Sequence, residues 1–329
     1  MKSKALAWLA ALALTFASAA EPLAVRAQPF IRQMADKHGF DAGELEKLFA
    51  DLEPDERVIK LISPPDAGGR PPVYWSEYRD RHINGRIIRA GMRFLRDHSG
   101  LLARAEDEYG VPRTIIAAII GIETRYGSYL GDFLLLRSLA TLGFDYPPRA
   151  EFFLGELEQL LLLAREMQIS PADLQGSYAG AFGMPQFLPT SARNWAVDFD
   201  GDGTVDLFSA ADAIGSVANF LKQHGWARKT PVAFKVSLQS GATPERLLGE
   251  DIIPEHDQNA FAAAGIIINF GSDLPYQGLM TLVDLVEEDQ EDEYRAGTGN
   301  YYVLTRYNRS NKYAMAVLDL ADEFASRLK

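Results

Sequence analysis

The strongest constraint on this chain is an apolar segment that carries one carboxylate on its buried side. Residues 115–127 read Ile-Ile-Ala-Ala-Ile-Ile-Gly-Ile-Glu-Thr-Arg-Tyr-Gly. With the spacing i, i+3, i+4, i+7, Glu123 shares one helix face with three isoleucines, Ile116, Ile119 and Ile120. Any fold that turns this face inward must place an acid where a core residue is expected.

The position of Glu123 within the predicted helix favours a role as a general acid. Pro112, just after Gly110, is typical of a helix start, and Gly127 is typical of a helix end. Glu123 then falls in the last turn, where the helix dipole opposes a carboxylate. Desolvation and the dipole both favour the protonated form, which a general acid near neutral pH requires. The alternative is a core glutamate paired with an arginine. Arg125 is a poor candidate for that partner, because a residue at i+2 points elsewhere.

Residues 1–20 have the pattern of a secretory signal peptide. Lys2 and Lys4 precede an apolar run from Ala5 to Phe16, and the small residues 17–20 offer a cleavage site. The run is too short for a permanent membrane span. The chain has no cysteine, and therefore no disulfide and no lipid-bearing Cys. We expect a soluble protein without a membrane anchor in an exported compartment, most simply a bacterial periplasm.

The charge of the chain argues against two classes of partner. Loss of Lys2 and Lys4 with the signal peptide takes the formal net charge from −12 to about −14. Electrostatic attraction therefore does not favour binding of this chain to nucleic acid or anionic lipid. The mature length of about 309 residues predicts two or three subdomains. The absence of coiled-coil heptads makes a monomer the default.

The periodicity predicts an α+β protein that is predominantly α. Helical spacing occurs in the ranges 28–60, 83–109, 112–126, 149–168, 210–224 and 313–328. Prolines and glycines at 64–72 predict a long irregular link. From Pro231 the pattern favours strands, with β-like segments at 232–238, 266–270 and 301–305. The acidic run 287–293 is expected to be a solvated loop.

The segment Gly176–Thr190 combines small residues, prolines and three aromatic residues. Such a fixed, non-helical backbone suits a polysaccharide cleft, in which aromatic faces meet sugar rings and the backbone approaches polar groups closely. The alternative is a structural loop that packs Phe182 and Phe187 into the core.

Residues 198–206, Asp-Phe-Asp-Gly-Asp-Gly-Thr-Val-Asp, form an EF-hand-like loop. Oxygen donors occupy positions 1, 3, 5 and 9, and Gly203 at position 6 allows a sharp turn. Position 12 holds Ser209 where the pattern wants a glutamate, but Asp212 can supply that ligand. The loop predicts a structural Ca²⁺ held by Asp198, Asp200, Asp202, Thr204 and Asp212. Na⁺ or a metal-free Asp/Gly turn are the alternatives.

Several segments together resemble the lytic murein transglycosylase B family of the lysozyme-like superfamily. They are residues 119–127, 140–147, 177–189, 198–212, 213–219 and 306–310, and the likeness runs from about residue 28 to 329. For the chain that remains after removal of the signal peptide 1–20, the resemblance implies three parts: an N-terminal helical domain 21–95, a lysozyme-like catalytic core 96–228 and 301–329, and a small β-containing insert 229–300.

The resemblance also implies a reaction. The β-1,4 bond between N-acetylmuramic acid and N-acetylglucosamine in peptidoglycan would be cleaved, with Glu123 protonating the bridging oxygen. The carboxylate would then take the proton of the C6 hydroxyl, which closes onto C1 to give a 1,6-anhydro sugar. One residue acts as acid and then base, so neither a second carboxylate nor a catalytic cofactor is required. If Asp132 or Asp145 faced Glu123, rather than capping a turn, a hydrolysing muramidase would be favoured. A non-catalytic wall-binding protein is the third reading.

Substrate contacts carry over from the family to single residues, for each of which packing is the alternative: Tyr78, Arg149, Ser177, Gln186, Phe187, Tyr307, Asn308 and Tyr313. Ser177 would hydrogen-bond Glu123 or the acetamido group, and Arg149 would meet a lactyl or stem-peptide carboxylate. Pro148 stands where a second arginine is expected. The implied partners are peptidoglycan glycan strands, with cell-wall synthesis or remodelling proteins as a further class.

Overall fold

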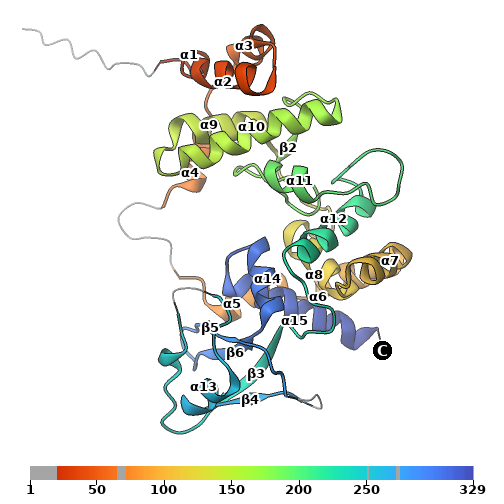
Figure 1. Cartoon of the computed structure of the whole chain (residues 1–329), viewed down its shortest axis with the longest axis vertical. Coiled ribbons are helices and arrows are strands. Elements are labelled where there is room, and N and C mark those ends of the chain that lie inside the picture. The colour runs from red at the N-terminus through yellow and green to blue at the C-terminus, as the bar shows by residue number, and fades with distance from the viewer. Residues whose placement is uncertain (1–20, 65–71, 250–251, 272–274, 329) are drawn as a thin grey trace, which may run out of the picture. The chain divides into compact units, whose positions relative to one another are not determined.

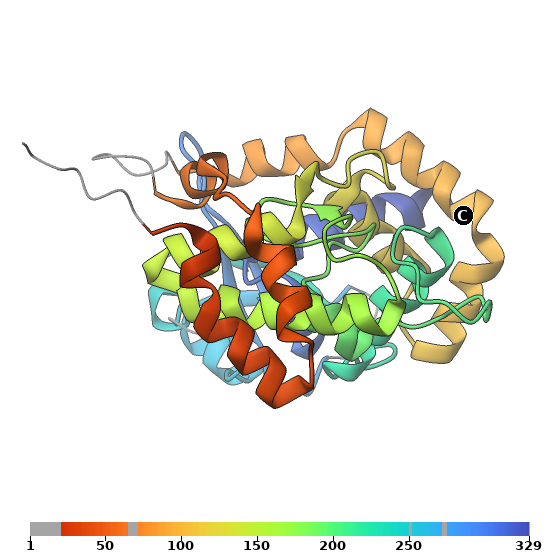
Figure 2. The ribbon, with the colours of Figure 1, turned by 90° about the horizontal axis from the view of Figure 1, so that it is seen from above.

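The computed structural model describes residues 21–64, 72–249, 252–271 and 275–328 (Figures 1 and 2). The expected signal peptide at 1–20 and most of the expected link, residues 65–71, lie outside the described residues. The chain divides into two compact units, of which the described parts are residues 21–53 and residues 54–328.

The first unit is a small helical cluster. It consists of α1 (Leu23–Arg26), α2 (Gln28–His38) and α3 (Ala42–Ala50). Helix α2 ends at Gly39, whose φ of 67° is the left-handed conformation that glycine adopts without strain. The side chain of Asp41 then caps α3 by accepting the backbone N–H of Glu44.

Most helices of the second unit follow from the predicted periodic segments. Their bounds are α4 (Glu56–Ile62), α5 (Trp75–His82), α6 (Gly85–Asp97), α7 (Ser99–Tyr109), α8 (Arg113–Thr124), α9 (Leu135–Asp145), α10 (Ala150–Met167), α11 (Pro189–Trp195), α12 (Ala210–Gln223), α13 (Gln258–Ala263), α14 (Gly299–Tyr307) and α15 (Asn311–Arg327). Helix α8 lies at the centre and packs against α6, α7, α12 and α15. Every residue from 115 to 121 is buried, as the apolar segment predicts.

A four-stranded antiparallel sheet lies within the expected insert, residues 229–300. Its strands are β3 (Ala233–Leu238), β4 (Ile266–Asn269), β5 (Thr281–Leu285) and β6 (Glu293–Gly297), in the order β4-β3-β6-β5. Buried apolar side chains from the sheet, α13 and its flanking loops form a separate small core around Phe234, Phe261 and Met280. A second, two-stranded sheet pairs β1 (Phe133–Leu134) with β2 (Gln175–Gly176).

Two predictions of secondary structure were wrong in type or extent. Residues 301–305 are helical in α14, because Thr298 caps its start and the apolar side chains pack inward at helical spacing, which outweighs their β propensity. The segment 83–109 is two helices, since the chain breaks at His98 between α6 and α7.

The expected domain boundary after residue 95 falls inside α6, and α6 packs against α8 and α15. No helix within the described ranges is both long and apolar enough to cross a membrane.

Candidate active site

Glu123 lies in the last turn of α8, and the chain reverses immediately after it. The helix ends at Thr124 because Arg125 (φ 51°) and Tyr126 (φ 60°) both adopt the left-handed conformation. The end therefore comes earlier than the expected stop at Gly127. The buried hydroxyl of Thr124 holds the reversal by accepting the N–H of Gly127 at 3.1 Å. Left-handed backbone at two consecutive non-glycine residues is strained, and such strain is concentrated at functional sites.

The carboxyl of Glu123 is held by one tyrosine. The hydroxyl of Tyr313, on α15, donates a hydrogen bond of 2.7 Å to Glu123 Oε1. Burial raises the pKa of Glu123 to about 7, and the hydrogen bond from Tyr313 opposes that rise. No second carboxylate is among the causes of this shift. The direction agrees with the sequence prediction that desolvation favours the protonated form.

Aromatic side chains that the sequence singled out surround this carboxyl. The rings of Tyr307 and Tyr313 stack with centroids 6.3 Å apart, and Phe187 lies 5.8 Å from Tyr307. Tyr307 donates its hydroxyl to the carbonyl of Pro185 at 2.6 Å. Burial, with the nearby charge of Glu123, raises the pKa of Tyr78 to about 12. The structure thus brings Tyr78, Tyr307 and Tyr313 close to Glu123, and Phe187 packs against Tyr307.

The loop 177–189 is built by its own polar groups. Ser177 accepts the N–H of Ala181 at its hydroxyl oxygen (3.0 Å), so this hydroxyl shapes the loop while Tyr313 bonds Glu123. Gln186, with φ 50°, donates its side-chain amide to the carbonyls of Leu130 (3.2 Å) and Gly183 (3.0 Å). Phe182 and Phe187 are buried, as the packing alternative expected.

Other expected residues lie apart from these contacts. Asn308 is exposed at the end of α14. Arg149 is exposed as well, with its guanidinium over the rings of Phe152 (4.4 Å) and Phe153 (5.0 Å). Asp132 is exposed and Asp145 ends α9, and neither is among the causes of the pKa shift at Glu123.

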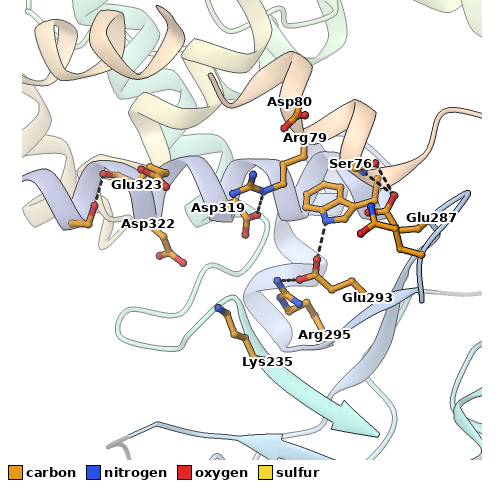
Figure 3. A pocket seen from close by; sticks show the side chains of 13 residues that line it. Ser76, Arg79, Asp80, Lys235, Glu287, Glu293, Arg295, Asp319, Asp322 and Glu323 are labelled. Atoms are coloured by element: carbon orange, nitrogen blue, oxygen red, sulfur yellow. Dashed lines mark hydrogen bonds and ion pairs between the residues drawn. The ribbon is translucent and has the colours of Figure 1, made fainter. Parts of the chain in front are cut away.

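Helix α5, which carries Tyr78, is anchored by acids that the sequence interpretation missed. Three side-chain hydrogen bonds hold this helix: Trp75 Nε1 to Glu293 Oε2 (3.0 Å), Ser76 Oγ to Glu287 Oε2 (2.8 Å) and Arg79 Nε to Asp319 Oδ2 (2.9 Å). The bonds of Ser76 and Arg79 can be followed in Figure 3. They border a pocket of about 570 Å³ between α5, α15 and the sheet. The acidic run is therefore solvated at 288–291, but both of its end residues bind α5.

A smaller cavity of about 270 Å³ adjoins Glu123 itself. It contains two further residues of α5, Arg81 and His82, together with Arg125 and Tyr129. The imidazole of His82 lies against the ring of Tyr78, with centroids 4.5 Å apart and the ring planes tilted by 38°. Periodicity could not have found this group, because it joins the end of α5 to residues beyond the end of α8.

The comparisons with known proteins agree with this geometry. The chain matches the transglycosylase SLT domain family over residues 24–322. The chain belongs to this family. This transglycosylase is 39% identical over 305 residues to the membrane-bound lytic murein transglycosylase B of Escherichia coli (strain K12). The aligned region covers 91% of this chain and 82% of that protein. It is therefore an enzyme, and the resemblance read from its motifs is confirmed.

Two solved structures share the fold of this transglycosylase. The soluble lytic transglycosylase SltB1 from Pseudomonas aeruginosa has a TM-score of 0.85 and 42% identity, covering 92% of this chain and 99% of that one. The Escherichia coli lytic transglycosylase Slt35, solved in complex with calcium, has a TM-score of 0.82 and 39% identity, covering 94% of both chains. The predicted lysozyme-like, mostly helical fold is confirmed.

The EF-hand-like loop of this transglycosylase brings three carboxylates together. One oxygen each from Asp198, Asp200 and Asp212 lies within 4.8 Å of the others. Asp212 is 1% exposed, and its two oxygens accept the N–H groups of Phe199 and Asp206, both at 2.7 Å. Three hard oxygen donors, two from the loop and one from the first turn of α12, fit a cation such as Ca²⁺.

The carboxylate of Asp202, another expected ligand, is not part of this group of three. It accepts the N–H of Thr204 at 2.8 Å. Gly203 has a φ of 94°, as the predicted sharp turn at position 6 requires.

Proposed function

We propose that this transglycosylase cleaves the β-1,4 bond between N-acetylmuramic acid and N-acetylglucosamine in peptidoglycan and leaves a 1,6-anhydro sugar. The observation that carries the proposal is one half-buried carboxyl, Glu123, with a pKa of about 7 and a tyrosine as its hydrogen-bond partner. A residue that titrates near neutral pH can give a proton in one step and take one in the next. The murein named for the Escherichia coli relative supports the substrate.

The reaction needs only Glu123 to move protons. The protonated carboxyl gives its proton to the bridging oxygen, and the bond from that oxygen to C1 breaks. The carboxylate that remains accepts the hydrogen bond of Tyr313, which stabilises the anion until it takes the proton of the C6 hydroxyl. The C6 oxygen bonds to C1, so the reaction consumes no water. We propose that Tyr78, Gln186 and Tyr307 contact the sugars, and that the buried ring of Phe187 supports Tyr307 from behind.

The pH profile of the enzyme should follow the protonation of Glu123. Because the acid must be protonated to start the reaction, kcat/KM should fall as the pH rises through about 7. Tyr313→Phe removes the hydrogen bond that lowers this pKa, so the falling limb should move to higher pH by roughly one unit. Profiles measured on one soluble glycan substrate test this prediction. A limb that stays in place, or moves to lower pH, would contradict it.

The compartment and the metal are part of the proposal. The pattern of residues 1–20 supports export to a periplasm. The oxygen donors of Asp198, Asp200 and Asp212 support a structural Ca²⁺, and none of the three lines the cavity beside Glu123. The calcium complex of Slt35 supports the same assignment.

The decisive experiment is mass spectrometry of the muropeptides that the mature protein releases from purified peptidoglycan. We expect anhydro products, each lighter by one water than the corresponding hydrolysis product. Hydrated products would indicate a muramidase instead. If the protein bound peptidoglycan without releasing any product, the wall-binding reading would be favoured.

A further inference from the structure

The cavity beside Glu123 has a composition that proton transfer alone does not explain. Its volume is about 270 Å³, and its lining comes from α5, α6, α8 and the segment that follows α8: Arg81, His82, Ile87, Gly121, Ile122, Glu123, Arg125 and Tyr129. The isoleucines and glycine form an apolar part of the lining. The charged part consists of the acid and two guanidinium groups.

The positive charge of this cavity comes from Arg81 and Arg125, which both lie near His82. The charges of Arg81 and Arg125 both contribute to lowering the pKa of His82, whose main cause is burial, so both guanidinium groups lie near that imidazole. His82 therefore stays neutral near neutral pH. Arg81 forms an exposed ion pair with Glu77, which leaves much of its charge available because exposed pairs are weak. Within the described residues, no carboxylate pairs with Arg125.

The backbone at Arg125 is what brings its side chain to the cavity. In a continuing helix, residue 125 would lie about 200° around the axis from Glu123 and would point away from it. The left-handed conformation at Arg125 ends the helix and places both side chains in one cavity lining. A non-glycine residue is strained in this conformation, and glycine would relieve that strain. Retained strain of this kind is concentrated at functional sites.

The arginine expected to meet an anion has a different environment. Arg149 lies over the rings of Phe152 and Phe153, and its neighbour is Pro148 instead of a second arginine. Arg81 and Arg125 instead share a cavity with the general acid. Two guanidinium groups around a small space recognise a carboxylate well, because each offers a planar set of N–H donors.

We propose that Arg125, assisted by Arg81, forms a subsite beside Glu123 that binds a carboxylate on the muramyl side chain of the substrate. This inference rests on the proposed function and adds to it a determinant of specificity. The carboxylate is either that of the lactyl group or one on the attached stem peptide. Its binding would set the muramyl residue, rather than N-acetylglucosamine, next to the general acid.

Binding can be measured without turnover in the Glu123→Gln protein. Three soluble glycan ligands separate the sources of charge: peptide-free strands with lactyl carboxylates, the same strands with these carboxylates converted to methylamides, and peptide-bearing strands. We expect the methylamide strands to bind more weakly than at least one charged ligand. Adding Arg125→Gln should weaken the charged ligand by roughly 10- to 100-fold and leave the methylamide strands unchanged.

Matched variants control for folding and for general charge. Arg125→Gly relieves the left-handed strain, so it should fold at least as stably and still lose the same affinity. Arg125→Lys should keep part of the affinity for the charged strands that Arg125→Gln loses. Arg96→Gln removes an exposed arginine of α6 that pairs with Asp97, and should change nothing. In the background with Glu123 intact, Arg125→Gln should raise KM for the charged strands more than it lowers kcat.

The outcomes separate this inference from the proposed function. If Arg125→Gln lost the same affinity for charged and for methylamide strands, the role of Arg125 would be purely structural. If it lost affinity for no ligand, Arg125 would take no part in binding. Either result overturns the subsite while leaving the enzyme a transglycosylase. If the Glu123→Gln protein bound none of the strands, and the wild type released no anhydro product, the proposed function and the subsite would fail together.

Discussion

Turnover of peptidoglycan by the Glu123→Gln variant should fall by roughly 10²- to 10⁴-fold. We expect the upper end of this range, because the same carboxyl gives the first proton and takes the second. The carboxamide keeps the size of the side chain and can still accept the hydrogen bond of Tyr313, so the site should keep its shape. Release of soluble muropeptides is the measurement. Glu46→Gln, at an exposed position of α3, provides the matched control with unchanged turnover.

The stability of this variant tests the same assignment independently. Glu123 has a folded-state pKa of about 7, above the ordinary value of 4.5, so the folded protein retains a proton that the unfolded chain loses between these pH values. The stability of the wild type should therefore decrease as the pH rises from about 4.5 through 7. Glutamine carries no charge at any of these pH values. The variant should be more stable than the wild type at pH 8, by on the order of 2–3 kcal/mol, and similar near pH 4. Denaturant unfolding at both pH values measures this difference, and near-normal turnover in the variant would refute the role of Glu123.

The second large effect should come from Asp212. Its buried carboxylate holds the N–H groups of Phe199 and Asp206 and offers an oxygen to the proposed Ca²⁺. An asparagine can accept at one oxygen only and carries no charge. We expect Asp212→Asn to lower the free energy of unfolding in Ca²⁺ by about 2–4 kcal/mol. Activity should persist at low temperature, because the loop takes no part in the proton transfers.

Thermal unfolding with and without a chelator separates the metal from the hydrogen bonds. The wild type should melt at a lower temperature once the chelator is added, whereas Asp212→Asn should respond little. Asp289→Asn, in the exposed loop between β5 and β6, is the control and should melt like the wild type. If the thermal midpoint of the wild type were the same with Ca²⁺ and with chelator, the proposed metal site in this loop would be refuted.

The sequence predicted those parts of the site that lie within one element. Three isoleucines at helical spacing were enough to find α8 and to place Glu123 at its buried end, because the helical period is a local property. The sharp turn at Gly203 and the oxygen donors of the 198–212 loop could also be predicted, since both follow from the spacing of neighbouring residues. These features need no knowledge of the rest of the chain.

The parts that depend on chain reversals or distant contacts could not be predicted from local patterns. The spacing placed Arg125 away from Glu123 because it assumed a helix that continues, and only the left-handed residue shows otherwise. The anchoring of α5 by Glu287 and Glu293 joins residues more than 200 positions apart. For Tyr313, only the family resemblance suggested a place near the site, because no periodicity connects it to Glu123.

The hydrogen bond between Tyr313 and Glu123 ties activity to the order in which the chain is made. The two residues are 190 positions apart, and the tyrosine comes second. The helix that carries Glu123 and the loop 177–189 are both synthesised before α15. An enzyme chain released or cut before residue 313 would therefore present the acid without the donor that stabilises its charged form. The proposed catalytic site is therefore complete only when α15 has been added.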